Sequence, residues 1–187
     1  MKRYTRKEAF ANSLAGAKSG DSGDQNFVGY CFDTGWGVAK DHKKAVYWYG
    51  VAARNGQIDA IFSLALKMDS GQGVRRNAAR ALELYKQAAE RDDLQSQTNL
   101  ACMLLEGDGV KCGSAVGMKW MKLAARRGDS RAQYNLGCAY ATGEDGLRLN
   151  LRFAKVWLSK AAENGHYRAR RLLDSLNRKS SLKTPHS

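Results

Sequence analysis

The sequence predicts an all-α fold, a right-handed α-solenoid of about four helical-hairpin repeats with partial caps at both ends. Glycines recur every 36 residues, at Gly35, Gly71, Gly107 and Gly143. Alanine pairs follow each of them, at residues 52–53, 88–89, 124–125 and 161–162. The chain has one proline and few β-branched runs, which argues against a mainly β fold. Self-similarity at a period of this length is typical of stacked repeat units.

Each 36-residue unit is expected to hold two helices, and each helix carries one apolar stripe. The first helix has apolar residues at i, i+4 and i+8, for example Ala132, Leu136 and Tyr140. The second has them at i, i+3, i+4 and i+7, as in AVYWYGVA at residues 45–52. Neither helix can bury its stripe alone, whereas stacked copies bury all the stripes in a continuous core.

Small and polar residues mark the contacts and ends of these helices. A small residue in the middle of each first helix lets a neighbouring helix approach closely; these residues are Gly29, Ala65, Ala101 and Gly137. A Gly-x-Gly turn joins the two helices of a unit, because glycine readily adopts the positive φ of such a turn. The candidate N-caps of the second helices are Asp41, Asn77 and Asn150.

The register divides the chain into repeats and caps. We expect a single solenoid domain over residues 1–176. Its four repeats cover about residues 21–56, 57–92, 93–128 and 129–165, and capping helices cover about 6–19 and 166–176. Residues 177–187, which are polar and basic, are expected to form a disordered tail.

The repeat resembles the Sel-one-like repeat, a relative of the tetratricopeptide repeat. That family's unit is close to A-x-x-x-L-G-x-x-Y-x-x-G-x-G-V-x-x-D-x-x-K-A-x-x-W-x-x-x-A-A-x-x-G. Residues 132–165, AQYNLGCAYATGEDGLRLNLRFAKVWLSKAAENG, match it apart from an extra loop residue and Asn150 at the Asp place. The resemblance implies a non-enzymatic adaptor that binds a partner protein on the concave face of the stack.

In tetratricopeptide-like stacks the first helix of each pair lines the concave face. The residues of those helices that packing does not use are therefore the candidate partner-binding residues: Asn26, Tyr30, Phe62, Leu66, Asp69, Thr98, Cys102, Tyr134 and Cys138. Phe62 and Tyr134 stand out, since aromatic side chains are frequent anchors in interfaces. Alternatively, these side chains pack between repeats.

No catalytic, metal or cofactor motif accompanies the repeats. The cysteines show no C-x-x-C spacing, and free thiols fit them better than a zinc site. Cys102 and Cys138 are one period apart, but neighbouring helices pack about 8–10 Å apart. A disulfide requires Cα atoms within about 7 Å, so we expect no bond between them. The Gly-x-Gly turn joins helices and therefore is no phosphate loop.

Composition narrows the cellular setting. No apolar run could span a membrane, and the N-terminal stretch lacks the apolar core of a secretory signal, which predicts a cytoplasmic protein.

The net charge of +13 is concentrated at the ends: residues 1–20 carry +4 and residues 166–187 carry +5. Two alternatives to an adaptor therefore stay open. One is an immunity or regulatory protein that neutralises one partner, and the other is anion or nucleic-acid binding through the basic termini. No nucleic-acid motif accompanies the basic pairs.

Overall fold

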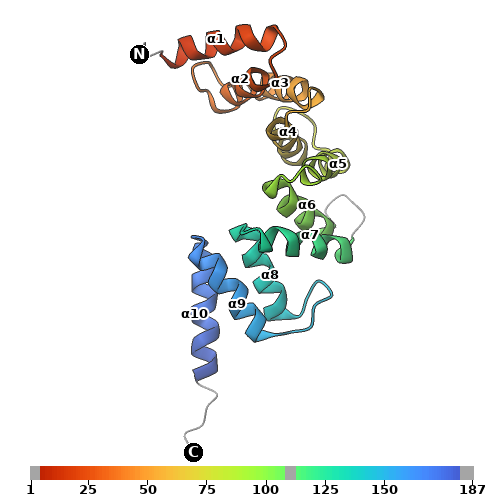
Figure 1. Ribbon diagram of the computed structural model, residues 1–187, viewed down its shortest axis with the longest axis vertical. Helices are drawn as coiled ribbons and strands as arrows, with labels where there is room; N and C mark the ends of the chain where they lie inside the picture. Colours follow the sequence, from red (N-terminus) through yellow and green to blue (C-terminus); the bar gives the residue numbers. More distant parts are fainter. Residues whose placement is uncertain (1–4, 108–112, 182–187) are drawn as a thin grey trace, which may run out of the picture. The chain divides into compact units, whose positions relative to one another are not determined.

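The computed structural model describes residues 5–107 and 113–181 of the chain. Ten helices and no strand form the regular structure of these residues (Figure 1). The helices are α1 (Arg6–Lys18), α2 (Ser22–Thr34), α3 (His42–Arg54), α4 (Ile58–Ser70), α5 (Ala78–Ala89), α6 (Leu94–Glu106), α7 (Ser114–Arg126), α8 (Ser130–Thr142), α9 (Leu151–Glu163) and α10 (Tyr167–Ser181). The expected all-α repeat fold is confirmed, with α2, α4, α6 and α8 as the first helices of the four hairpins.

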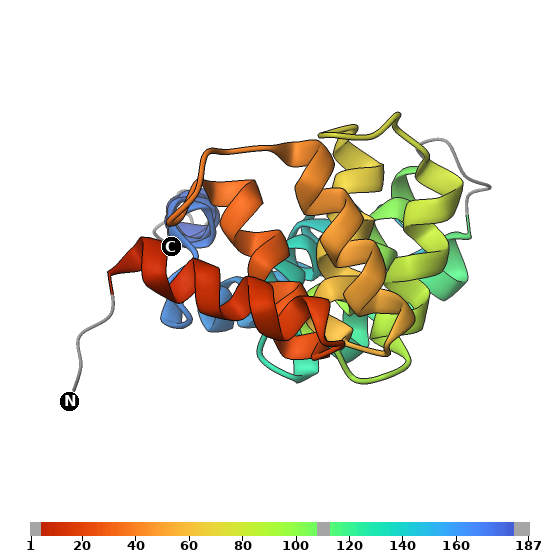
Figure 2. The same ribbon diagram turned by 90° about the horizontal axis from the view of Figure 1, so that it is seen from above.

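The chain divides into two compact units, residues 1–96 and 97–187, which are described separately. In the first unit each helix from α1 to α4 packs on the next helix in sequence, as Figure 2 shows. In the second unit α7 packs on α8, α8 on α9, and α9 on α10. Each hairpin thus buries its apolar stripes against its sequence neighbours, as repeat architectures require.

The ends of the helices follow the expected signals. The first helices α2, α4 and α8 each end at a glycine with a left-handed backbone conformation. At the start of the second helices, the side chains of Asp41, Asn77 and Asn150 accept hydrogen bonds from the backbone N–H groups three residues later. These bonds measure 3.0, 3.0 and 3.1 Å, so the three predicted N-caps are confirmed.

The core consists of the two predicted stripes. On the second helices, small and large side chains alternate in buried positions; in α3 these are Ala45, Tyr49 and Ala52. On the first helices, the central apolar residue is fully or nearly buried, as Leu136 is in α8. A methyl group added to Gly137 would lie 2.8 Å from Cγ of Leu158. The missing side chain therefore sets how closely α8 and α9 pack.

A buried glutamine links successive hairpins in each unit. In the first unit the Gln25 side chain donates to the Ala17 carbonyl at 3.1 Å and accepts from Asn55 at 2.8 Å. In the second unit the Gln133 side chain donates to the Ala125 carbonyl and accepts from Asn164, each at 3.0 Å. The amide satisfies carbonyl and amide groups at helix ends that burial would otherwise leave unpaired.

The C-terminal boundary differs from the expectation. Helix α10 runs to Ser181, whereas the sequence predicted that the last helix ends near residue 176 and that a disordered tail begins at residue 177. The segment 177–181 contains no glycine or proline to stop a helix, and Leu176 packs against the cluster of Leu158, Ala161 and Ala169. Residues 182–187 of the predicted tail lie outside the described residues.

Candidate partner-binding surface

Successive first helices form a pocket in each unit, and the two pockets occupy the same place in the repeat. The first pocket, between α2 and α4, has a volume of about 270 Å³ and is lined by Asp33, Ser63, Leu66, Lys67, Ser70 and Gln72. The second pocket, between α6 and α8, has a volume of about 240 Å³ and is lined by Cys102, Leu105, Glu106, Met121, Asn135, Cys138, Ala139, Glu144 and Asp145. Five lining positions are common to both at a spacing of 72 residues: Asp33 and Leu105, Ser63 and Asn135, Leu66 and Cys138, Lys67 and Ala139, Gln72 and Glu144.

The first pocket holds a lysine of the chain itself. Lys67 is only 7% exposed, although lysine is rarely buried without a partner. Its ammonium donates to Asp33 Oδ1 and, at 3.0 Å, to Gln72 Oε1. Asp33 Oδ1 also lies 2.7 Å from Nδ1 of His42, at the start of α3. The ammonium is therefore neutralised by a carboxylate that α2 contributes.

The second pocket has different chemistry at the same place. Leu105 and Ala139 replace the Asp33–Lys67 pair, and Glu144 replaces Gln72. The Asn135 side chain lies 3.4 Å from the Cys102 sulfur and connects α8 with α6. Burial raises the pKa of the Cys102 and Cys138 thiols, and both thiols are free. The thiols are therefore poor nucleophiles, and they act as apolar walls of the pocket.

The predicted binding residues of the first unit differ in accessibility. Tyr30 and Leu66 are exposed, at 46% and 40%, and Leu66 lines the first pocket. Phe62 is half-buried, with its ring 6.1 Å from that of Tyr85 on α5. The carboxylate of Asp69 is 3.8 Å from Arg76, and the Asn26 side chain is half-buried.

In the second unit the structure brings Cys102 and Cys138 together in one pocket, buries Thr98 and leaves Tyr134 half-buried. Thr98 is fully buried and offers no side-chain surface to a partner. The Tyr134 ring stacks on the imidazole of His166 at 4.4 Å and packs against the core cluster below α10. Tyr134 therefore contributes to packing, as in the alternative that the sequence left open, and part of its side chain stays accessible.

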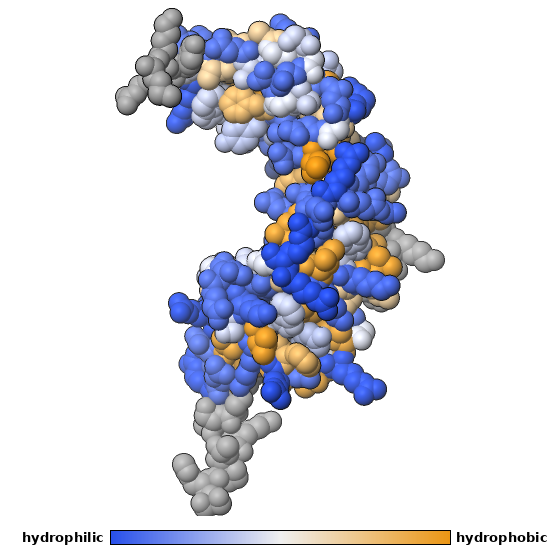
Figure 3. Space-filling model, in the orientation of Figure 1, coloured by the Kyte–Doolittle hydropathy of each residue, from blue (hydrophilic) through white to orange (hydrophobic). Residues whose placement is uncertain are grey.

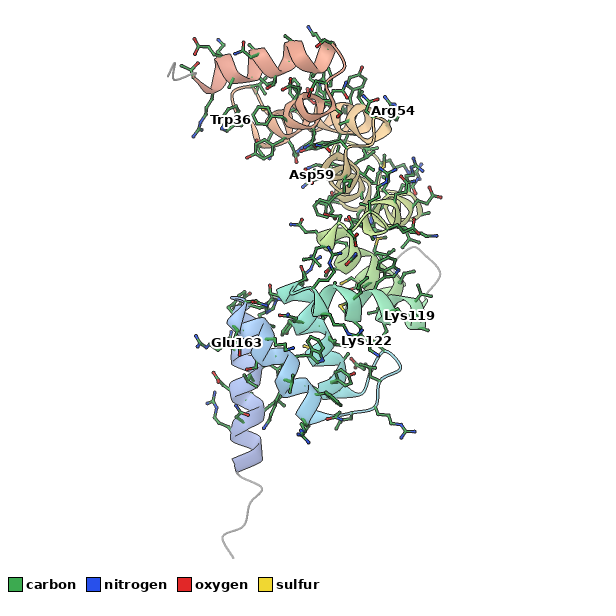
Figure 4. The ribbon with its side chains drawn as sticks, in the orientation of Figure 1. Trp36, Arg54, Asp59, Lys119, Lys122 and Glu163 are labelled. Atoms are coloured by element: carbon green, nitrogen blue, oxygen red, sulfur yellow. The ribbon has the colours of Figure 1, made fainter. Side chains whose placement is uncertain are left out.

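Sequence reasoning missed several residues of this surface. Trp36, labelled in Figure 4, lies in the loop after α2. Its ring packs edge-to-face on Phe27 at 5.3 Å, and Phe27 stacks on Tyr30 at 6.2 Å. Lys67 was also missed, although its register position carries Cys31, Met103 and Ala139 in the other repeats. A charged residue at an otherwise apolar register position is the signal that could have identified it.

Two general findings limit the chemistry of the described residues. No group of three or more His, Cys, Asp or Glu side chains in the part of the chain that the structure describes is arranged to hold a metal ion. None of the helices described is both long and apolar enough to cross a bilayer. Polar residues cover most of the visible face of each unit, with smaller apolar areas between them (Figure 3).

The repeats match a known family model. The model of the Sel1 repeat matches residues 24–57, 58–93, 94–129 and 130–166, well over half of the chain. The chain belongs to the Sel1 repeat family. Sel1 repeat proteins are generally protein-interaction scaffolds, and each of the four matched segments holds one hairpin of the structure. No functionally curated protein matches the chain significantly.

Solved structures of Sel1 repeat proteins share the fold. A protective antigen of uropathogenic Escherichia coli is 36% identical, with a TM-score of 0.81, over 86% of this chain and 34% of its own. A Sel1 repeat protein from Oxalobacter formigenes is 26% identical, with a TM-score of 0.84, over 91% of this chain and 70% of its own. An immunity protein from Pseudomonas aeruginosa is 17% identical, with a TM-score of 0.56, over 90% of this chain and 62% of its own, which shows the fold alone. The chain thus spans about a third of the length of the Escherichia coli protein.

Proposed function

We propose that this Sel1 repeat protein is a non-enzymatic scaffold that binds an extended segment of another protein along its first helices. The observation that carries the proposal is the recurrence of an open pocket between first helices, at the same register position in both units. Two further pockets lie on second helices, one between α3 and α5 and one beside α7, but unlike the first-helix pockets they do not occupy the same place in the repeat as each other. An open pocket of this kind, beside exposed side chains of a first helix, suits an extended segment that inserts a side chain into it.

Exposed anchors on the first unit support the proposal. Tyr30 is 46% exposed and extends the ring cluster of Phe27 and Trp36, and Leu66 lies 40% exposed on the next first helix. Large rigid side chains that are exposed beside a pocket are typical interface anchors, because they bury much apolar area at a low cost in conformational entropy. We therefore propose Tyr30 and Leu66, in place of Phe62 and Tyr134, as the residues that contribute most to binding.

The test is partner binding by surface variants of the full chain. A tagged chain expressed in its native host recovers the partner, and binding is then measured by calorimetry for Tyr30→Ala, Leu66→Ala and the double variant. We expect the double variant to bind at least about 30-fold more weakly, which corresponds to about 2 kcal/mol for a pair of interface anchors.

The matched control is Tyr47→Ala. Tyr47 is 62% exposed, but it lies on the second helix α3 and stacks edge-to-face with Trp48. Its removal should leave the affinity within about twofold of the native value. Loss of binding in Tyr47→Ala, with full binding in the Tyr30 and Leu66 variants, would place the partner on the second helices and contradict the proposal.

A further inference from the structure

We propose that the second pocket, between α6 and α8, binds the side chain of a lysine in the partner's segment. The inference rests on the proposed function, since it names the chemistry of one contact in that interface. It starts from the first pocket, where the repeat already accommodates a lysine: Lys67 is 7% exposed and its ammonium is held by Asp33 and Gln72. The chain thus contains a template for a lysine bound at this place in the fold.

In the second pocket no lysine takes the equivalent register position. Ala139 takes the register position of Lys67 and is 4% exposed, so the second unit supplies no stem and no ammonium there. Leu105 takes the position of Asp33, which adds an apolar wall in place of the carboxylate. The pocket has a volume of about 240 Å³ and is open to solvent, so a side chain of another molecule can enter it.

Acceptors for a cation are nevertheless present. Gln72, whose amide oxygen accepts from Lys67, is replaced by Glu144, and a carboxylate accepts from an ammonium more strongly than an amide does. Glu106 and Asp145 add two further carboxylates to the lining. None of the three forms an ion pair with a lysine or arginine of the described residues. Arg131 lies near the Cys102 side, but it donates to Asn99 and does not line the pocket.

The walls and the mouth of the pocket match the two parts of a lysine side chain. Leu105, Met121 and Cys138 offer apolar and polarizable contacts to four methylene groups. Glu106 and Glu144 are exposed, so an ammonium beside them keeps part of its hydration. Burial and, less strongly, the nearby Glu144 carboxylate raise the pKa of Asp145, and a cation beside the two carboxylates would favour their charged forms.

The net charge of the chain affects how the pocket contributes to the rate and to the affinity of partner binding. The chain carries a net charge of +13, so long-range attraction does not favour a basic partner. Screening limits this repulsion to a range of about 8 Å at physiological ionic strength, and the carboxylates of the pocket act at contact distance. The pocket should therefore increase the affinity and the specificity of a bound complex and should not speed its formation.

The experiment uses a small lysine probe on the full chain. The ¹⁵N-labelled protein is titrated with Nα-acetyl-lysine N-methylamide and, separately, with the norleucine analogue, which has a similar stem and no charge. We expect saturable chemical-shift changes in amides of residues 102–106 and 135–145 with the lysine probe alone. Equal shifts with the norleucine probe, or shifts outside these segments only, would overturn the inference.

Three variants make the test specific. Glu144→Gln replaces the charged carboxylate by a neutral amide. The affinity for the lysine probe should fall at least about tenfold, which corresponds to about 1.4 kcal/mol. Ala139→Lys places a lysine where the first unit has Lys67 and should exclude the probe. Glu163→Gln is the matched control, because Glu163 is exposed in the same unit but lies on α9 (Figure 4), and it should leave probe binding unchanged. Because Ala139→Lys changes a buried position, Glu144→Gln decides the question if that variant does not fold.

The same variants separate this inference from the proposed function. A partner that depends on Tyr30 and Leu66 but binds Glu144→Gln and Ala139→Lys with native affinity would overturn the lysine pocket alone. Native partner affinity in Tyr30→Ala, Leu66→Ala and their double variant would overturn the proposed binding surface, whatever the lysine probe shows. Loss of partner binding in all four variants, with retention in Glu163→Gln and Tyr47→Ala, supports both.

Discussion

At the scale of single residues, the buried lysine of the first unit is the most unusual feature of the structure. Lys67 lies between two first helices and depends on Asp33 and Gln72 for its hydrogen bonds. A buried charge is costly when it loses its partner, whereas replacing both members of a pair by apolar groups can be nearly neutral. The second unit already contains such a replacement, with Leu105 and Ala139 at the two positions.

The first prediction follows from this pair. Asp33→Leu alone leaves the Lys67 ammonium without its carboxylate and should lower the free energy of unfolding by about 1–3 kcal/mol in urea titrations. The double variant Asp33→Leu/Lys67→Ala reproduces the residues of the second unit and should recover part of that loss. Strictly additive effects of the two changes would show that the pair contributes no coupling energy.

The second prediction concerns pH and Cys31. Burial raises the pKa of the Cys31 thiol from 9.0 to about 11. Below pH 9 the thiol is protonated in both states, and its contribution to stability is complete. Between pH 9 and 11 the unfolded chain releases the proton while the folded chain retains it, which costs at most about 1.4 kcal/mol per pH unit. Urea unfolding should therefore show a steeper loss of stability in this window for the native chain than for Cys31→Ala; identical slopes would contradict the assignment.

Individual residues also show how far sequence reasoning extends. The caps Asp41, Asn77 and Asn150 were predictable because a cap depends on residues only three positions away. The accessibility of Phe62 and Tyr134 was not predictable, because it depends on Tyr85 in α5 and on His166 directly before α10. The repeat register correctly assigned them to first helices but could not tell which side chain the next helix covers.

At the scale of helices, close contacts depend on a few positions without side chains. A methyl group at Gly29 would lie 2.7 Å from the Tyr49 ring, and one at Gly137 would lie 2.8 Å from Leu158. In each case a first helix packs on the second helix of its own hairpin. The end of α10 could not be predicted in this way. The repeat pattern ends before residue 176, and no glycine or proline follows to stop the helix, which therefore continues to Ser181.

The third prediction compares two glycine-to-alanine variants in helices. Gly137→Ala should destabilise the protein by about 1–3 kcal/mol, because the clash with Leu158 outweighs the gain of about 1 kcal/mol in helix propensity. Gly50→Ala should stabilise α3 by up to about 1 kcal/mol, because the nearest atom to its new methyl group is the end of the Arg54 side chain at 3.8 Å. Thermal melting of the two variants tests the contrast, and equal shifts in Tm would contradict it.

At the scale of the whole molecule, the sequence predicted the repeat and the hairpins from the 36-residue register, and the family from the resemblance of residues 132–165 to that family's unit. Such an array is stabilised mainly by contacts between neighbouring hairpins. The pockets between first helices could be predicted only in position, because their chemistry depends on side chains that differ between equivalent places, such as Lys67 and Ala139. The single domain expected over residues 1–176 remains a prediction, and the structure describes two compact units.

The fourth prediction tests the nearest-neighbour character of the array. Leu136 is 1% exposed in the core of the second unit, and Leu136→Ala should cost about 2–5 kcal/mol. Native-state hydrogen exchange should show the largest loss of protection in α7–α10, since these helices belong to the same packed series. An equal loss in α1–α4 would indicate that the chain unfolds as one cooperative body.

The central claim is that hairpins stacked in register leave the pockets between first helices free for a partner. Hydrogen-exchange mass spectrometry of the full chain, with and without the recovered partner, tests this claim most directly. We expect added protection in α2, α4, α6 and α8, concentrated around Leu66, Cys102 and Cys138, and native exchange in α3 and α9. Protection confined to α3, α5, α7 and α9 would contradict the account.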